Sequence, residues 1–425
     1  MIILVFLGSL LAAMAIGMPI AYALLVSAVA MMLQLGLFDS QIIAQNLIGG
    51  VDSFPLMAVP FFMLAGEVMN RGGLSRRIID LALSIVGHTS GGLGYVVIIS
   101  ATLLSAISGS AIADAAALAA LLVPAMVAAG HQPARAAGLV ASSSIIAPVI
   151  PPSIGLVLFG VTANVSITGL FLGGIVPGIV MAMGLAVTWY YLASREKVVL
   201  PERASGRTIL INARRAGWAL FMPVIIIVGL KLGVFTPTEA AVVAAVYSIF
   251  VSVVIYRELT LSALMDVFVA AAKSTAMVMF LVGAAVVTSW LIVIADLPVM
   301  LGDLLEPLVG SPQFLMFVIV LIVLLVGTAM DMTPTILILA PVLMPIVREA
   351  GIDPIYFGII FVITNSIGLI TPPVGTVLNA VTGVTKIKME DVIRGANPFL
   401  LAHTAVLLLL LLVPQIVTLP VSWMR

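Results

Sequence analysis

The chain has 425 residues, of which 63% are hydrophobic and 8% are charged, and its formal net charge at pH 7 is zero. Soluble domains carry roughly a quarter charged residues, so this composition excludes a soluble globular protein and indicates an integral membrane protein. The apolar residues form long runs and do not alternate as in a membrane β-barrel, so they predict an all-α polytopic fold. The absence of cysteine excludes disulfides, thiolate nucleophiles and most structural zinc sites.

The first half of the chain is a series of apolar segments separated by short turns. The first run begins at Met1 without a positively charged start and continues toward Phe38, so we expect an ordinary span and not a cleavable signal peptide. Residues 40–53 predict a lateral arm, and residues 258–273 in the second half predict another, followed by a span at 274–296. Residues 92–130 are apolar but interrupted by glycine and serine, which predicts a re-entrant hairpin. A proline-rich span at 136–165 and a closing span at 169–194 follow.

A basic loop at 195–217 separates the two halves. Only Glu196 and Glu202 oppose its positive charges. By the positive-inside rule we expect this loop on the cytoplasmic side. Its basic residues are Arg195, Lys197, Arg203, Arg207, Arg214 and Arg215.

The second half repeats the plan of the first. Short stretches agree, AAGHQP with EAGIDP and VIPPSIG with LITPPVG. Chance rarely gives so many matches at one offset, so the chain is interpreted as a duplication. At an offset of 221 residues, Pro124, Gly130, Pro133, Pro151 and Pro152 correspond to Pro345, Gly351, Pro354, Pro372 and Pro373.

The basic clusters indicate the orientation of the two copies. If 92–130 and 314–349 are re-entrant hairpins, every basic cluster lies on the cytoplasmic side and the copies run in opposite directions. This predicts an inverted-topology repeat with about ten spans, two re-entrant hairpins, two proline-broken spans and both termini outside, as in elevator-type ion transporters. The predicted divisions are a first repeat at 1–194, the loop at 195–217 and a second repeat at 218–425, with a transport domain of 92–165 plus 314–382 and a scaffold of the remaining spans.

Each copy breaks one apolar span with prolines. Proline removes a backbone donor, and lipid offers no water to the carbonyls that are freed. In inverted-repeat transporters such carbonyls bind Na⁺, and the absence of a carboxylate cage argues against Ca²⁺. The alternative is a plain kink relieved by neighbouring hydroxyls. The first predicted sodium site comprises Ser105, Ser108, Ala147, Ile150 and Pro152, and the second comprises Gly327, Gly368, Thr371 and Pro373.

Polar side chains near the four breaks are the candidate substrate ligands. No lysine or arginine lies inside either broken span, so an anionic substrate is expected to meet half-helix N-termini and hydroxyls. The candidates are Ser108, Ser110, Ser144, Ser153, Thr328, Asn365, Thr376 and Asn379.

Two carboxylates, Asp114 and Asp331, occupy matching places inside the membrane region. An ionisable residue at that depth is a candidate for coupling transport to an ion. The alternative is helix capping, because Thr328-x-x-Asp331 resembles a capping box. The stretch FTPTEAA predicts a capping box between Thr236 and Glu239, whereas Glu67 has no evident role.

The remaining motifs point away from enzymes. No P-loop is present, so we expect no ATP hydrolysis, and His88, His131 and His403 share no metal or triad spacing. An intramembrane enzyme would have only Asp114 and Asp331 as catalytic candidates. A passive channel fits poorly, because midplane breaks suit an occluded site better than a pore.

The combination of motifs resembles one family over nearly the whole chain. FPLMAVPFFMLAGEVMNRGG, SGSAIADAAALAALLVPAM, SSIIAPVIPPSIG, FTPTEAA and GLITPPVGTVLNAV are similar to the large membrane subunit of TRAP (tripartite ATP-independent periplasmic) transporters. The resemblance implies Na⁺-driven import of an organic acid across a bacterial inner membrane by an elevator motion. It also implies two partners, a small four-helix membrane subunit and a periplasmic substrate-binding protein. Because the sequence starts at the large subunit's first span, the small subunit is expected as a separate chain.

One departure from the family bears on the substrate. Many dicarboxylate-type members carry a GLNLF-like stretch after the TPP motif, whereas this chain has Gly375-Thr376-Val377-Leu378-Asn379 and resembles the sialic-acid branch. Extra hydroxyl and amide groups suit a polyhydroxylated sugar acid such as sialic acid. The alternatives are a C4-dicarboxylate TRAP transporter and a stand-alone Na⁺/dicarboxylate symporter.

Overall fold

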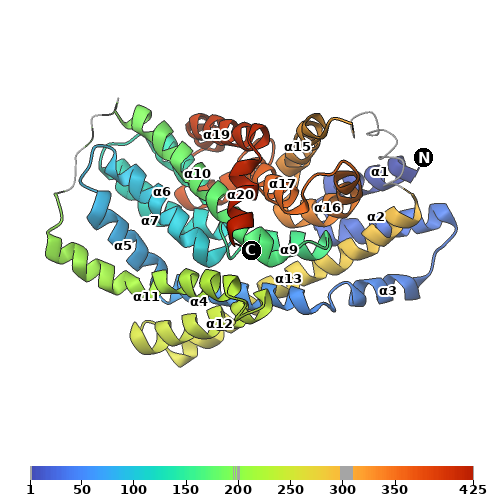
Figure 1. Cartoon of the computed structure of the whole chain (residues 1–425), viewed down its shortest axis with the longest axis horizontal. Coiled ribbons are helices and arrows are strands. Elements are labelled where there is room, and N and C mark those ends of the chain that lie inside the picture. Colours follow the sequence, from blue (N-terminus) through green and yellow to red (C-terminus); the bar gives the residue numbers. More distant parts are fainter. Residues whose placement is uncertain (1, 195, 197, 199–201, 297–309, 425) are drawn as a thin grey trace.

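A computed structural model describes residues 2–194, 196, 198, 202–296 and 310–424. Regular structure in this part of the chain is entirely helical, which confirms the predicted all-α polytopic fold (Figure 1). Eight of the helices are long and apolar enough to cross a membrane, or nine if one bent pair is a single span. Arg195 and Lys197 of the predicted basic loop lie outside the described residues.

The first repeat begins with spans and an arm. Gly36, with φ of 69°, ends α2, and the Asp39 side chain caps the arm helix α3. A bend of 62° separates the arm from the helix that follows it. The elements are α1 (Ile2–Ala15), α2 (Ile20–Leu35), α3 (Ser40–Gly49), the 3₁₀ turn η1 (Phe54–Met57), α4 (Ala58–Arg71) and α5 (Leu74–Val86).

The predicted hairpin and broken span of the first repeat are both present. The hairpin helices are α6 (Gly92–Ser108) and α7 (Ala111–Ala128), with a tip at 109–110. The broken span consists of α8 (Pro133–Ser144) and α9 (Ile154–Thr162), and α10 (Ile167–Ala193) closes the repeat.

The second repeat follows the same order. It contains α11 (Gly206–Lys231), α12 (Pro237–Phe250) with the π-helical turn η2 (Val251–Ile255), α13 (Leu261–Ile294), the hairpin α15 (Pro312–Ala329) and α16 (Met332–Glu349), the broken pair α17 (Pro354–Gly368) and α18 (Thr376–Thr385), α19 (Met389–Leu412) and α20 (Gln415–Met424).

One predicted element differs from the structure. Residues 258–273 were expected to form a lateral arm separate from the span at 274–296, but 261–294 form one uninterrupted helix, α13. No proline or glycine lies near the expected junction, so nothing in the chain interrupts the hydrogen-bond ladder there. In Figure 1, α13 runs as one long rod with α3 packed along it.

Equivalent helices of the two repeats pack against each other's repeat in the same way. The half-helix α9 packs against the other repeat's hairpin helix α16, and α18 packs in the same way against α7. The closing helices behave alike, because α10 packs against α17 and α19 packs against α8. Two repeats related by a pseudo-two-fold axis produce such reciprocity, and it brings both hairpins and both broken spans into one body.

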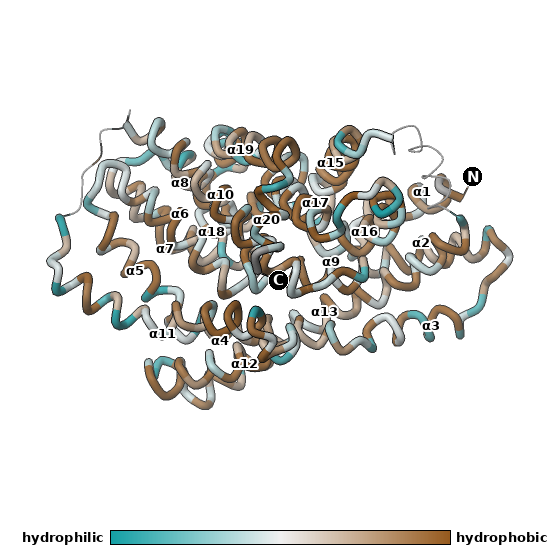
Figure 2. Tube along the Cα trace, viewed as in Figure 1, coloured by the Kyte–Doolittle hydropathy of each residue, from teal (hydrophilic) through white to brown (hydrophobic). Residues whose placement is uncertain are grey.

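A second group of helices surrounds that body. Helix α4 packs against α12 and α13, and α2 packs against α1 and α13. Most helices are apolar along their length, while hydrophilic residues gather in loops and at helix ends (Figure 2). The helices that carry the hairpins and breaks therefore pack against a second group of mainly apolar spans.

Candidate functional site

The prolines end helices where the sequence predicts. Helix α8 stops at Ser144 and α9 starts at Ile154, while α17 stops at Gly368 and α18 starts at Thr376. Residues 145–153 of the first break are all buried, whereas Pro372, Pro373 and Val374 of the second are exposed. The two breaks are equivalent in sequence but differ in how the surrounding protein covers them.

The tip of the first hairpin rests on the first break. Gly109 has φ of +61°, a conformation that favours glycine, and a Cβ built on it would lie 2.6 Å from the carbonyl oxygen of Pro152. Ser105 and Ser108 lie in the last turn of α6, and Ala147, Ile150 and Pro152 lie in the break. The structure thus brings the two halves of the first predicted sodium site to the same tip-to-break contact.

Asp114 holds the last turn of α6 and does not cap its own helix. Its buried carboxylate accepts a hydrogen bond of 2.6 Å from the Ser108 hydroxyl, and that hydroxyl in turn accepts one from the Ser110 N–H at 3.2 Å. The cap of α7 is Ser110, whose hydroxyl accepts from the Ala113 N–H. The Asp114 Oδ2 atom has no hydrogen-bond partner among the described residues, which leaves one buried acceptor beside the tip.

The second hairpin repeats this contact with different residues. The Val374 N–H in the break donates to the carbonyl oxygen of Thr328 at 3.2 Å. A Cβ built on Gly368 would lie 2.8 Å from the Gly327 carbonyl oxygen, so the two backbones touch. The Thr371 hydroxyl donates to the Ile367 carbonyl at 2.7 Å. Gly327, Gly368, Thr371 and Pro373, which make up the second predicted sodium site, therefore lie at one junction.

The capping box considered as the alternative role of Thr328 and Asp331 does not form. Thr328 is still in the last turn of α15, where its hydroxyl donates to the Leu325 carbonyl at 2.8 Å. Asp331 is itself the N-cap residue of α16 and makes no side-chain capping bond. Its Oδ1 atom accepts a long hydrogen bond, 3.5 Å, from the Thr376 hydroxyl of the second break.

Two amide side chains support the second junction. Asn365 is fully buried, its Nδ2 donates to the Met332 carbonyl at 3.3 Å, and its Oδ1 has no partner in the described part of the chain. Asn379 donates from Nδ2 to the Val374 carbonyl at 2.9 Å. Both amides therefore contact backbone on either side of the tip.

A cavity of about 160 Å³ lies where the tips and breaks meet. Its lining includes the first residues of three helices, namely α7, α9 and α16. Helix N-termini carry partial positive charge, and no lysine or arginine lines this space. The lining residues are Met63, Gly109, Ser110, Ala111, Ile112, Pro148, Ile154, Gly155, Val278, Asp331, Met332, Thr333 and Leu369.

Of the eight predicted substrate residues, Ser110 is the one that lines this cavity. The coupling candidate Asp331 lines it as well. The Ser144 hydroxyl donates to the Val140 carbonyl, and the Ser153 hydroxyl donates to the Pro148 carbonyl and caps α9. These two hydroxyls therefore already have partners within the protein.

Sequence analysis missed the contribution of the surrounding helices. Met63 of α4 and Val278 of α13 line the cavity, and so does Thr333 in the first turn of α16. Met63 and Val278 sit in ordinary apolar runs, where nothing distinguishes them from lipid-facing residues.

Other residues singled out in the sequence have structural roles. The Thr236–Glu239 capping box is present, and Glu67 forms an ion pair with Arg71 at 2.8 Å on the surface of α4. His131 lies 2.5 Å from Glu196, which also accepts from Arg135 at 2.5 Å. His403 contacts the Ser142 carbonyl at 2.9 Å. Within the described residues no three acidic or histidine side chains form a metal cluster.

Comparison with known proteins gives one consistent result. Residues 7–416 match the family described as "Tripartite ATP-independent periplasmic transporter, DctM component". The chain is 54% identical, over the full length of both proteins, to the 2,3-diketo-L-gulonate TRAP transporter large permease protein YiaN of Escherichia coli (strain K12). It is 38% identical to the sialic acid TRAP transporter large permease protein SiaM of Vibrio cholerae, over 94% of this chain and 93% of that relative.

The fold is shared with solved structures, one of which is a transporter. The Alcanivorax borkumensis YdaH transporter, described as having an unusual topology, matches with a TM-score of 0.64 and 18% identity, over 88% of this chain and 89% of that one. At this identity the likeness concerns the fold alone.

Proposed function

Since this chain belongs to the family of DctM components of tripartite ATP-independent periplasmic transporters, we propose that it imports a sugar-derived organic acid by Na⁺ symport. As a member of that family it is a multi-pass permease of the bacterial inner membrane and not an enzyme.

The convergence of three helix N-termini on one cavity carries the proposal. Helices α7, α9 and α16 begin at its lining, so their dipoles favour an anion there. A carboxylate could be bound in this way without a lysine or arginine. The Asp331 carboxylate in the same lining adds a negative charge, and we infer that a cation bound nearby offsets it.

The two tip-to-break junctions are the proposed cation sites. At each of them helices end, so backbone carbonyls lack intrahelical partners and can coordinate Na⁺. The contacts of Gly109 with Pro152 and of Gly368 with Gly327 make each site depend on a closed hairpin. Na⁺ binding would then favour the hairpin position that completes the substrate cavity.

Coupling to about two Na⁺ ions has an electrical consequence. Two cations with one monocarboxylate carry one net positive charge inward. A membrane potential contributes about 2.3 kcal/mol per charge per 100 mV, so uptake should accelerate when the inside is negative.

The substrate class follows from the relatives and from the second break. YiaN is named for 2,3-diketo-L-gulonate and SiaM for sialic acid, and both are hydroxyl-rich monocarboxylates. The hydroxyl of Thr376 and the amide of Asn379, both on α18 beside the second junction, add polar groups that suit such a molecule. We place a diketogulonate-like acid first and sialic acid second.

The proposed motion is an elevator movement of the body that carries the breaks. Helices α10 and α19 pack against the hairpin and broken-span helices, so we extend the moving body, first defined as 92–165 plus 314–382, to include them. The surrounding helices would then form the scaffold and bind a small four-helix membrane subunit. A periplasmic binding protein would deliver the substrate, with both termini of this chain on the periplasmic side.

A reconstituted uptake assay tests the proposal. The chain, its small membrane subunit and the binding protein are assembled in proteoliposomes and offered 2,3-diketo-L-gulonate, sialic acid or succinate. The proposal expects sugar-acid uptake that requires both an inward Na⁺ gradient and the binding protein. Succinate uptake without the binding protein would instead indicate a stand-alone dicarboxylate symporter.

A further inference from the structure

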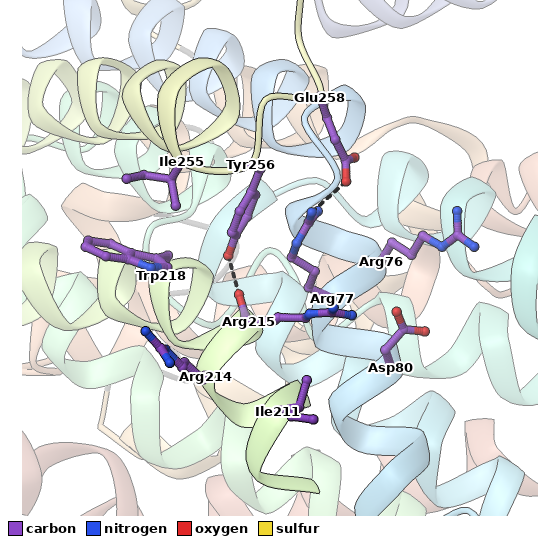
Figure 3. Close-up of a pocket in the computed structure, with 10 residues that line it drawn as sticks. All are labelled: Arg76, Arg77, Asp80, Ile211, Arg214, Arg215, Trp218, Ile255, Tyr256 and Glu258. Atoms are coloured by element: carbon purple, nitrogen blue, oxygen red, sulfur yellow. Dashed lines mark hydrogen bonds and ion pairs between the residues drawn. The ribbon is translucent and has the colours of Figure 1, made fainter. Parts of the chain in front are cut away.

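A basic pocket of about 760 Å³ lies between α5, α11 and the segment that follows η2. Four arginines and two carboxylates line it, which gives a formal charge of +2. Figure 3 shows Arg214 and Trp218 on one side of the opening and Arg76, Arg77 and Asp80 on the other. None of these residues lines the cavity between the hairpin tips.

One arginine is fixed as part of the pocket wall. Arg77 pairs with Glu258 at 2.7 Å, and its guanidinium carbon lies 3.7 Å from the centre of the Tyr256 ring. The Tyr256 hydroxyl donates to the carbonyl oxygen of Arg215 at 2.5 Å. This network joins α5, α11 and the end of η2, so the wall is held in place without any ligand.

The other three arginines keep their charge available. Arg76, Arg214 and Arg215 are exposed and form no ion pair with any acidic side chain in the described part of the chain. The guanidinium group presents paired N–H donors that match the oxygens of a phosphate group. Asp80 adds one opposing charge at the rim, which leaves the pocket net positive.

Apolar residues adjoin the arginines. Ile211, Trp218 and Ile255 are 42%, 43% and 36% exposed and line the same pocket. Arg214 and Arg215 belong to the basic segment that the positive-inside rule assigns to the cytoplasmic surface. Arginines beside an exposed tryptophan at that level suit a lipid with an anionic headgroup above and acyl chains alongside.

We propose that this pocket binds a phosphate group, presented either by an anionic phospholipid of the cytoplasmic leaflet or by a free phosphate anion. The apolar rim favours the phospholipid. The phosphate site is independent of Na⁺ coupling and of the transported acid. The phosphate-binding test can therefore fail while the uptake assay succeeds, and the reverse.

The test measures thermal unfolding of the full chain purified in a neutral detergent. Short-chain phosphatidylglycerol, phosphatidylcholine and inorganic phosphate are titrated in separate arms. The double variant Arg214→Gln/Arg215→Gln removes two candidate ligands, and Arg207→Gln, on the same helix but outside the pocket lining, is the matched control. At about a fivefold loss per arginine, the double variant should bind phosphatidylglycerol roughly 25-fold more weakly.

Each outcome decides the proposal. Stabilisation by phosphatidylglycerol over phosphatidylcholine, lost in the double variant and kept in Arg207→Gln, supports the lipid site. Stabilisation by inorganic phosphate with the same variant pattern, and no lipid preference, supports a site for a free anion. Equal behaviour of the double variant and the control in all arms overturns the proposal. So does loss of the effect once the small membrane subunit is bound, because acidic side chains of that subunit would then occupy the pocket. If the double variant does not fold, Arg214→Gln alone is compared with the same control.

Discussion

Replacing Gly368 by alanine should weaken Na⁺ coupling at the second junction. A Cβ at this position would lie 2.6 Å from the Gly327 carbonyl carbon and 2.8 Å from its oxygen. Both atoms belong to backbone, which cannot rotate away as a flexible side chain can. The hairpin tip must therefore move off the proline break, and the carbonyls proposed to bind Na⁺ would separate.

The size of the effect follows from the packing. Forcing one extra carbon into a close-packed interior typically costs about 1–3 kcal/mol. If that strain acts only on the Na⁺-bound, closed state, the affinity for Na⁺ falls by roughly 5- to 150-fold. We expect the Na⁺ concentration that gives half-maximal uptake to rise by a factor in that range, with membrane insertion unchanged.

The control for this experiment is Gly383→Ala. Gly383 is an exposed position of α18, and a Cβ there would meet nothing within 4 Å. Na⁺-dependent uptake in proteoliposomes should be unaltered in the control. A half-saturating Na⁺ concentration for Gly368→Ala within twofold of the control would refute the argument, because the junction would then have no part in ion binding.

Three further variants test other parts of the account. Glu196→Gln should lower the free energy of unfolding by about 1–3 kcal/mol, because it removes the carboxylate that pairs with both His131 and Arg135. Thermal unfolding measures this, with the exposed Glu202→Gln as the control. Equal melting temperatures of the two variants would contradict the prediction. Asp114→Ala should reduce Na⁺-dependent uptake more than Asp114→Asn, since asparagine keeps an acceptor for the Ser108 hydroxyl; equal losses would show that the hydrogen bond is unimportant. Thr236→Ala should lower the melting temperature through loss of the helix cap while leaving Na⁺ dependence unchanged, and an altered Na⁺ response would argue against a purely structural cap.

The sequence was sufficient for the fold because its strongest constraints are local or periodic. Paired prolines at Pro151–Pro152 and Pro372–Pro373 must interrupt a helix wherever they occur. Their recurrence at one offset identified the duplication, and the hairpins followed from glycine and serine inside apolar runs. The predicted division of this region into an arm and a separate span was wrong because no helix-breaking residue lies at the expected junction, so α13 continues through it.

The candidate site was predictable only in part. Tip and break residues could be paired by the repeat, and the structure places Gly109 against Pro152 and Gly368 against Gly327. The sequence pattern does not identify Met63 and Val278 as cavity residues, because their position depends on which helices pack across the cavity. The capping box considered as an alternative for Thr328 and Asp331 does not form because Thr328 still belongs to the last turn of α15. Motif spacing describes neighbours along the chain, whereas each hairpin tip is shaped by contacts with the proline break of its own repeat.

The most direct test of the central claim is the simultaneous entry of ²²Na⁺ and a labelled sugar acid into proteoliposomes that contain the assembled transporter. If the breaks bind Na⁺ around a shared substrate cavity, each flux should require the other, and an inside-negative potential should accelerate both. Sugar-acid entry that proceeds at the same rate when K⁺ replaces Na⁺, with no accompanying ²²Na⁺ flux, would contradict the account.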